Sequence, residues 1–258
     1  MSTHIPLRFH HWIYVWIPIF TALMWFATLL AMLVTWLAMG RPKYPTQDGK
    51  VAYISDIGAS RLKPLFVVGC AVTGFGFFLC LLYERYLRHT GRLMPNMRMR
   101  ERVFSVLAII CGLIGGFGLL FLSIFDTKRF PKEHRIFLLV FIVGVGFSAI
   151  FSVIEYRWLS KDFEGLKQLR GAYIAKGVIG FLLIICAIVF AITLFQAPDV
   201  GGVFEWVIAF GYTFYLLTYW YDLRLSKNVE KGELMARYGP HAHPESGSNI
   251  NMTQVTQA

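Results

Sequence analysis

The amino-acid sequence predicts an all-α fold, a polytopic bundle of six transmembrane helices. Of its 258 residues, 56% are hydrophobic and only 16% are charged, whereas soluble domains carry about 25% charged residues. The mean hydropathy is +0.55, and long runs without charge recur along the chain. A soluble domain of this size lacks the polar surface to cover so many apolar residues, and the composition is too apolar for a disordered chain. The sequence therefore indicates an integral membrane protein.

Six runs with few charged residues are long enough to cross a membrane, which takes about 20 apolar residues per helix. We expect the spans at about 12–39, 64–83, 103–125, 136–154, 174–197 and 203–221. The first run is too long for a signal peptide and lacks a short apolar core followed by a small-residue cleavage site. Residues 1–225 are therefore predicted to form one transmembrane domain, and residues 226–258 a largely disordered cytosolic tail.

The distribution of positive charge predicts the orientation of the bundle. The net charge is +10, and the segments on the side of the two termini contain fifteen of the 25 Lys and Arg residues, against nine on the other side. Short loops rich in Lys and Arg stay in the cytosol. We therefore expect both termini to be cytosolic.

The two long cytosolic loops, at about 84–102 and 155–173, are basic. In the second loop, basic residues alternate with apolar ones near helical spacing, which is typical of an amphipathic helix in the membrane interface. Basic clusters beside a membrane attract anionic lipids by roughly 1 kcal/mol per charge. The alternative is that these charges only set the topology and recognise no particular lipid. The candidate anionic-lipid contacts are Arg98, Arg100, Arg102, Arg157, Lys161, Lys167 and Arg170.

Small residues recur within the predicted spans. Gly112 and Gly116 form a GxxxG pattern in the third span, and small side chains let the backbones of two membrane helices approach closely. We expect these glycines to pack helices within the bundle. A homodimer face is the alternative, since the pattern alone is a weak signal.

Three ionisable residues, Asp56, His134 and Glu205, stand near the starts of even-numbered spans. Ionisable groups at membrane depth are the first candidates for function. Because all even-numbered spans begin on the non-cytosolic side, the three side chains are expected at one membrane level, where they could converge. The alternative is that Asp56, with Ser55, and Glu205 cap helix N-termini and complement the helix dipole. Lys176 is a further candidate on the cytosolic side, for which snorkelling to the headgroups is the favoured interpretation.

No sequence motif indicates an enzyme. The chain contains no nucleophile elbow, P-loop, HExxH or dinucleotide-binding motif. All four cysteines lie inside apolar runs, without the spacing of a zinc site or a disulfide framework. We therefore expect no metal and no cofactor, and nothing in the charge distribution suggests a nucleic acid as partner.

Four short motifs occur in the order of a known family. The segment Tyr-Ile-Ser-Asp-Ile-Gly at 53–58 precedes the second span, the third span is rich in glycine at 112–118, and His134 opens the fourth. In the last span, Glu205 and the tryptophan after it begin a motif that Asp222 closes. In these motifs the chain resembles the DRAM/FRAG/SFK family, which comprises damage-regulated autophagy modulators, a GPI-anchor lipid-remodelling protein and the fungal suppressor of FK-sensitivity.

The resemblance covers about residues 12–222 and implies which residues form the outer-side polar cluster. These are Ser55, Asp56, Gly58, His134 and Glu205. Family members commonly have Pro-Glu shortly after the first motif, whereas this chain reads Ala-Ser-Arg-Leu-Lys-Pro at 59–64. The missing acid favours the fungal branch, the one like the suppressor of FK-sensitivity.

The resemblance implies a non-enzymatic protein that regulates membrane lipid homeostasis or phosphoinositide signalling at the plasma membrane. Its basic loops would bind anionic phospholipids or a phosphatidylinositol 4-kinase complex. One alternative is an autophagy modulator in a lysosomal or vacuolar membrane. The other is a GPI-anchor lipid-remodelling factor or enzyme of the ER or Golgi, with Asp56, His134 and Glu205 as its site or as metal ligands.

Overall fold

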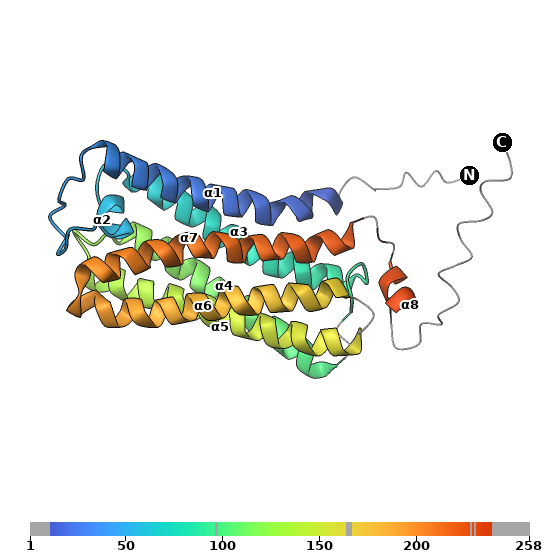
Figure 1. Cartoon of the computed structure of the whole chain (residues 1–258). Coiled ribbons are helices and arrows are strands. Elements are labelled where there is room, and N and C mark those ends of the chain that lie inside the picture. Colours follow the sequence, from blue (N-terminus) through green and yellow to red (C-terminus); the bar gives the residue numbers. More distant parts are fainter. Residues whose placement is uncertain (1–10, 96–97, 164–166, 228, 230, 239–258) are drawn as a thin grey trace, which may run out of the picture.

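Six long α-helices, two short ones and one 3-10 turn (η2, Arg224–Ser226) make up the described part of the structure, a computed structural model that describes residues 11–95, 98–163, 167–227, 229 and 231–238. The described residues contain no β-strand. Figure 1 shows the long helices side by side, with α2 at one end of the bundle and α8 beyond the other; we call these the α2 end and the α8 end. The helices are α1 (His11–Ala38), α2 (Ile54–Gly58), α3 (Lys63–His89), α4 (Met99–Ile124), α5 (Pro131–Asp162), α6 (Lys167–Gln196), α7 (Pro198–Leu223) and α8 (Glu233–Tyr238).

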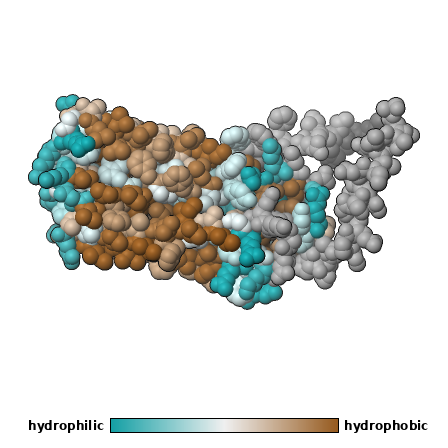
Figure 2. Space-filling model, viewed as in Figure 1, coloured by the Kyte–Doolittle hydropathy of each residue, from teal (hydrophilic) through white to brown (hydrophobic). Residues whose placement is uncertain are grey.

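Six segments are long and apolar enough to cross a membrane, one for each long helix, and the last also includes the 3-10 turn at Arg224–Ser226 that follows α7. These segments are Tyr14–Ala38, Lys63–His89, Met99–Ile124, Pro131–Lys161, Leu169–Gln196 and Pro198–Ser226. On the face that Figure 2 shows, apolar residues cover the middle of the bundle and hydrophilic residues lie at both ends. Helices suit a bilayer because they satisfy their backbone hydrogen bonds internally. The prediction of an all-α bundle with six spans is therefore confirmed.

The helices continue beyond the runs of apolar residues from which the spans were predicted. α5 covers 131–162 where the apolar run covers 136–154, and α6 begins at 167 rather than 174. Backbone hydrogen bonding continues into the membrane interface, where charged side chains meet water. The predicted interfacial helix at about 155–173 is therefore wrong. Its described residues belong to the end of α5, to Phe163 that caps α5, and to the start of α6. Its apolar residues Leu159 and Phe163 are buried in the protein.

The six long helices form a closed ring. Each packs against two neighbours in the order α1, α3, α4, α5, α6 and α7, and α7 packs back onto α1. Buried apolar side chains, among them Leu29, Phe77 and Tyr215, fill the middle of the ring.

Glycines bring α3, α4 and α5 close together. A Cβ atom at Gly116 of α4 would lie 2.9 Å from the carbonyl oxygen of Gly74 on α3, and one at Gly115 would lie 2.9 Å from the backbone nitrogen of Val145 on α5. A Cβ atom at Gly112 would clash with a side chain of α3. Both glycines of the GxxxG pattern therefore face a neighbouring helix of the same chain, as small residues do where membrane helices pack closely.

A second cluster of buried apolar side chains lies at the α8 end. It consists of Leu87, Leu93, Met94, Tyr156, Leu159, Phe163, Leu169, Ala172, Leu223 and Leu234. Leu234 belongs to α8, so part of the segment predicted as a largely disordered tail is a helix that packs onto the bundle. The remaining residues of that segment, 239–258, lie outside the described residues, as do residues 1–10.

Candidate functional site

The loop before α2 is hydrogen-bonded to the first turns of α7. The Glu205 carboxylate accepts the backbone N–H of Ile54 at 2.6 Å. The indole nitrogen of Trp206 donates to the carbonyl oxygen of Ala52 at 3.0 Å. Two adjacent side chains of α7 thus satisfy alternate backbone groups of the loop, one as acceptor and one as donor.

Further hydrogen bonds extend this contact to the first residues of α7. The Tyr53 hydroxyl donates to the carbonyl oxygen of Pro198 at 2.9 Å. The Asp199 carboxylate accepts the backbone N–H of Val51 at 3.0 Å and that of Lys50. We call this contact between residues 50–54 and residues 198–206 the latch.

Asp56 organises the loop from inside α2. Its carboxylate accepts the hydroxyl of Thr46 at 2.5 Å and the backbone N–H of Tyr53 at 3.1 Å. Burial raises the pKa of Asp56 above its ordinary value, although both hydrogen bonds act in the opposite direction. Burial also raises the pKa of Tyr53 to about 12, helped by the neighbouring carboxylates of Glu205 and Asp56. Asp56 and Glu205 therefore both cap the N-terminus of α2, where negative charge complements the helix dipole.

His134 of α5 and Asp126, which lies between α4 and α5, complete the α2 end. The buried imidazole Nδ1 of His134 lies 2.8 Å from the carbonyl oxygen of Leu122 and 2.9 Å from that of Phe125. Because carbonyl oxygens only accept, Nδ1 carries the proton and His134 caps the C-terminus of α4. Asp126 pairs with Lys63 at 2.5 Å. Burial acts to raise the pKa of Asp126, but the lysine and a backbone N–H outweigh it, so this pKa lies below its ordinary value.

The three predicted ionisable residues all lie at the α2 end, but each is hydrogen-bonded to backbone groups. No three metal-binding side chains come together among the residues that the structure describes. Of the other members of the predicted cluster, Ser55 accepts the hydroxyl of Thr127 through its carbonyl oxygen at 3.4 Å. Gly58 leaves room for an aromatic ring of α3, since a Cβ atom there would lie 2.5 Å from that ring. The geometry gives the cluster a structural role, and a role in ligand binding stays a prediction.

Charged side chains inside the bundle near the α8 end form a second site that sequence analysis did not predict. The Lys176 ammonium lies 2.6 Å from the Asp222 carboxylate, and the two side chains are 0% and 1% exposed. Arg88 lies 2.9 Å from Glu84 and 3.6 Å from Glu155. We call these five residues, which come from α3, α5, α6 and α7, the buried ionic cluster.

The predicted snorkelling of Lys176 to the headgroups is therefore wrong. Its ammonium lies 3.7 Å from the centre of the Tyr219 ring and is enclosed by protein. Glu84, Arg88 and Glu155 follow the apolar runs of the sequence, and for that reason they were expected in loops. The position of Asp222 within the last-span motif was the available signal for an acid that faces the core.

A pocket of about 430 Å³ opens at the α8 end, between the end of α3 and the start of α4. We call it the basic pocket, because four of its lining residues carry basic side chains. The Arg88 guanidinium also donates to the carbonyl oxygen of Met94 at 3.2 Å, which fixes one wall. The lining residues are Arg85, Arg88, His89, Pro95 and Arg102.

The predicted anionic-lipid contacts are distributed around the α8 end. Arg102 lines the basic pocket. The Arg100 guanidinium lies 3.6 Å from the centre of the Trp158 ring, and the Lys161 ammonium lies 4.9 Å from it. The Lys167 side chain lies outside the described residues. Arg98, Arg157 and Arg170 are exposed. The pocket residues of α3 were missed because this helix was predicted to end at 83, whereas it continues to His89.

Residues 13–226 match the family model described as Frag1/DRAM/Sfk1/Cwh43P N-terminal domain. The chain belongs to this family. The matched region contains the latch, the buried ionic cluster and the basic pocket. With its six apolar helices, the chain is an integral membrane protein of the Frag1/DRAM/Sfk1 family. No solved structure matches it.

Curated relatives confirm the fungal Sfk1-like branch. The chain is 29% identical over 216 residues to protein sfk1 of Schizosaccharomyces pombe, covering 84% of this chain and 65% of the relative. It is 28% identical over 192 residues to protein SFK1 of Saccharomyces cerevisiae, covering 63% and 54%. It is 27% identical over 198 residues to DNA damage-regulated autophagy modulator protein 1 of Homo sapiens, covering 69% and 81%. The chain thus spans less than two thirds of the length of either yeast relative.

Two of the four motifs that carried the resemblance to the Frag1/DRAM/Sfk1 family contact each other in the structure. The segment at 53–58 contains α2 with its capping residues, and Glu205 and Trp206 hold the start of that segment. Short motifs far apart in sequence therefore form one physical unit, the latch.

Replacing Glu205 with leucine should loosen the latch. The buried N–H of Ile54 would lose its acceptor, which costs about 1–3 kcal/mol, whereas Glu205→Gln keeps an acceptor oxygen in place. The measurement is the rate at which a membrane-impermeant maleimide labels a cysteine introduced at Val51, which packs near Gly202. Labelling should accelerate in Glu205→Leu and stay near the parent rate in Glu205→Gln. Equal rates in all three proteins would show that Glu205 does not hold the loop.

Proposed function

We propose that this protein is a non-enzymatic regulator of lipid homeostasis or phosphoinositide signalling in the plasma membrane. Its α8 end faces the cytosol and binds anionic phospholipid headgroups. The observation that carries this proposal is the basic pocket, which gathers Arg85, Arg88, His89 and Arg102 at the membrane boundary. The same surface is the proposed contact for a phosphatidylinositol 4-kinase complex.

The chemistry of the basic pocket suits a phosphorylated headgroup. Guanidinium groups donate paired hydrogen bonds to phosphate oxygens. Arg88 is anchored by Glu84 and by the Met94 carbonyl oxygen, so its position is set before a ligand arrives. Arg85 and Arg102 come from different helices and converge on the pocket. The excess of Lys and Arg on this side supports a cytosolic orientation.

The Arg85→Gln, Arg102→Gln double variant tests this proposal. Each basic residue near an anionic lipid contributes about 1 kcal/mol, so the affinity for a short-chain phosphatidylinositol 4-phosphate should fall about 30-fold. The measurement is a titration of the purified full-length protein in detergent. Lys128→Gln, Lys132→Gln is the matched control, because both lysines are exposed at the α2 end. An unchanged affinity in the pocket variant, with normal folding, would contradict the proposal.

A second candidate function is autophagy regulation in a lysosomal or vacuolar membrane. It is supported by the similarity to DNA damage-regulated autophagy modulator protein 1 of Homo sapiens, of which the alignment covers 81%. The two candidates differ in location. A fluorescent protein fused to the C-terminus would mark the plasma membrane under the first and the lysosome or vacuole under the second.

A further inference from the structure

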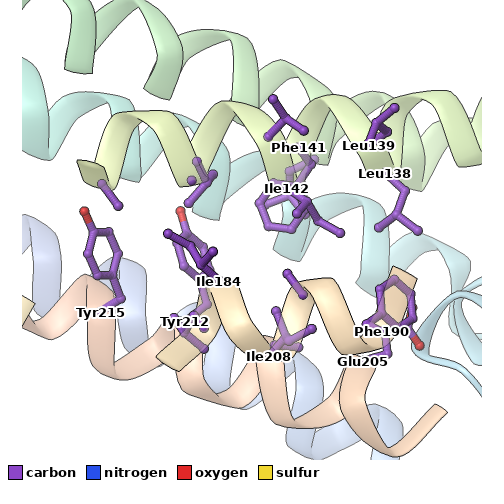
Figure 3. Close-up of a pocket in the computed structure, with 18 of the residues that line it drawn as sticks. Leu138, Leu139, Phe141, Ile142, Ile184, Phe190, Glu205, Ile208, Tyr212 and Tyr215 are labelled. Atoms are coloured by element: carbon purple, nitrogen blue, oxygen red, sulfur yellow. The ribbon is translucent and has the colours of Figure 1, made fainter. Parts of the chain in front are cut away.

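A cavity of about 380 Å³ lies between α5 and α6, with α7 behind it. We call it the lateral crevice. Figure 3 shows Leu138 and Ile142 of α5 across from Ile184 of α6 and Ile208 of α7. Its lining is almost entirely apolar. Most lining residues lie between Leu138 and Ile150 on α5, between Gly180 and Ala191 on α6 and between Glu205 and Tyr215 on α7. The buried residues Trp25, Ile54, Phe66, Leu119 and Leu122 of α1 to α4 complete the lining on the side of the bundle interior.

The lateral crevice opens toward the surface that faces lipid. On α5 its lining residue Leu139 is 62% exposed, and on α6 its lining residue Ile188 is 56% exposed. These residues belong to segments apolar enough to cross the membrane. Acyl chains rather than water therefore surround the opening. An apolar cavity at this depth is filled by an acyl chain.

The length of the lateral crevice matches one leaflet of a bilayer. From Leu138 to Ile150 it follows α5 for about 18 Å, at about 1.5 Å per residue. Half of a hydrocarbon core of about 30 Å is about 15 Å. The crevice begins near the α2 end, where Glu205 lines it, and reaches Tyr215 near the middle of α7. It has the dimensions and the depth of a single acyl chain of the leaflet at the α2 end.

A positive charge lies at the mouth of the lateral crevice. Arg135 is exposed on α5, one turn before Leu138 and Leu139, and its guanidinium lies 5.4 Å from the centre of the Phe195 ring of α6. It therefore bridges the two helices on either side of the opening. A guanidinium at this level suits the phosphate of a phospholipid. The acyl chains around the opening belong to the phospholipids of the bilayer, so a phospholipid is favoured over a free fatty acid as the occupant.

We propose that the lateral crevice binds one glycerophospholipid from the leaflet at the α2 end. One acyl chain lies in the crevice, and the phosphate contacts Arg135. This site is separate from the basic pocket, which lies at the other end of the bundle. Failure of one proposal therefore leaves the other intact.

Gly146 supplies a variant that fills the lateral crevice without disturbing the fold. It lines the crevice, and a Cβ atom added there would meet no other atom within 4 Å. Gly146→Leu therefore places a side chain in the space proposed for the acyl chain. Gly171→Leu is the matched control. Gly171 likewise has no atom within 4 Å of an added Cβ, but it does not line the crevice.

A variant of Tyr212 distinguishes an acyl chain in the crevice from a ligand with a polar group. This buried residue lines the crevice with its phenol ring. Figure 3 shows its oxygen pointing toward α5. An acyl chain needs no hydrogen bond, so Tyr212→Phe should bind it as well as the parent does. A ligand with a polar group at this depth would lose affinity.

The experiment uses the full-length protein in nanodiscs that contain a phosphatidylcholine with a photoactivatable diazirine midway along one acyl chain. After illumination, mass spectrometry maps the labelled peptides. We expect labels concentrated in 138–150 and 180–191, reduced at least tenfold in Gly146→Leu and unchanged in Gly171→Leu and Tyr212→Phe. Arg135→Gln should reduce them about tenfold, because it removes a charged hydrogen bond. Thermal unfolding of each variant establishes that it folds.

Three results would overturn the proposal. The first is labelling spread evenly over all lipid-facing helices and unaffected by Gly146→Leu. The second is equal labelling by a diazirine-bearing free fatty acid, insensitive to Arg135→Gln, which would assign the space to a fatty acid. The third is loss of labelling in Tyr212→Phe, which would assign it to a ligand with a polar group.

Discussion

Replacing Lys176 with methionine should destabilise the protein by about 3–5 kcal/mol, the usual cost of removing one partner of a buried ion pair. Asp222 is 1% exposed and would lose the counterion that lies 2.6 Å away. The second oxygen of this carboxylate has no hydrogen-bond partner in the described part of the chain, so Lys176 is its main support. The measurement is the free energy of unfolding of the purified protein in detergent.

The double variant Lys176→Met, Asp222→Leu tests whether the lost stability comes from the unpaired carboxyl of Asp222. Replacing both members of a buried pair by apolar residues of similar size is often neutral or stabilising, so it should recover much of the lost stability. Lys128→Met, at an exposed position of the α2 end, controls for loss of positive charge. If Lys176→Met alone were as stable as the parent, the ammonium would be solvated and the pairing with Asp222 would be unimportant.

Replacing Gly116 with leucine should separate α3 from α4 and destabilise the bundle by about 3 kcal/mol or more. Overpacking a tight core costs about 1–3 kcal/mol even where side chains can move aside. Here the neighbour is backbone, since a Cβ atom at Gly116 would lie 2.9 Å from the carbonyl oxygen of Gly74. The check is the thermal unfolding midpoint together with the yield of folded protein in size-exclusion chromatography.

Gly146→Leu is the matched control for this prediction. It introduces the same side chain on the adjacent helix α5, at a position where an added Cβ meets no atom within 4 Å. We expect it to fold with a midpoint near that of the parent. A homodimer interface at the GxxxG pattern would give a different result. In that case Gly116→Leu would convert dimers to monomers and leave the unfolding midpoint unchanged.

The number and approximate positions of the six helices were predictable from the sequence, because the requirement that a bilayer imposes is local. Any segment that crosses the hydrocarbon core must be apolar over about 20 residues, and this can be recognised without knowing its neighbours. The shared membrane level of Asp56, His134 and Glu205 was also predictable, because successive spans alternate in direction. The ends of the helices were less predictable, because α3 and α5 continue through charged residues that also occur in loops.

The partners of the polar side chains were decided by how the helices pack, and they could not be predicted from the sequence. A residue's position along its helix places it at a depth in the membrane, but the direction in which it points depends on how the helix is rotated against its neighbours. Lys176 has the depth of a snorkelling residue, yet the rotation of α6 turns it toward Asp222 of α7. Glu205 has the position of a cap for its own helix, yet it caps α2. The depth of a residue in the membrane follows from its position along one helix. Its partner depends on contacts between helices that are distant in the chain.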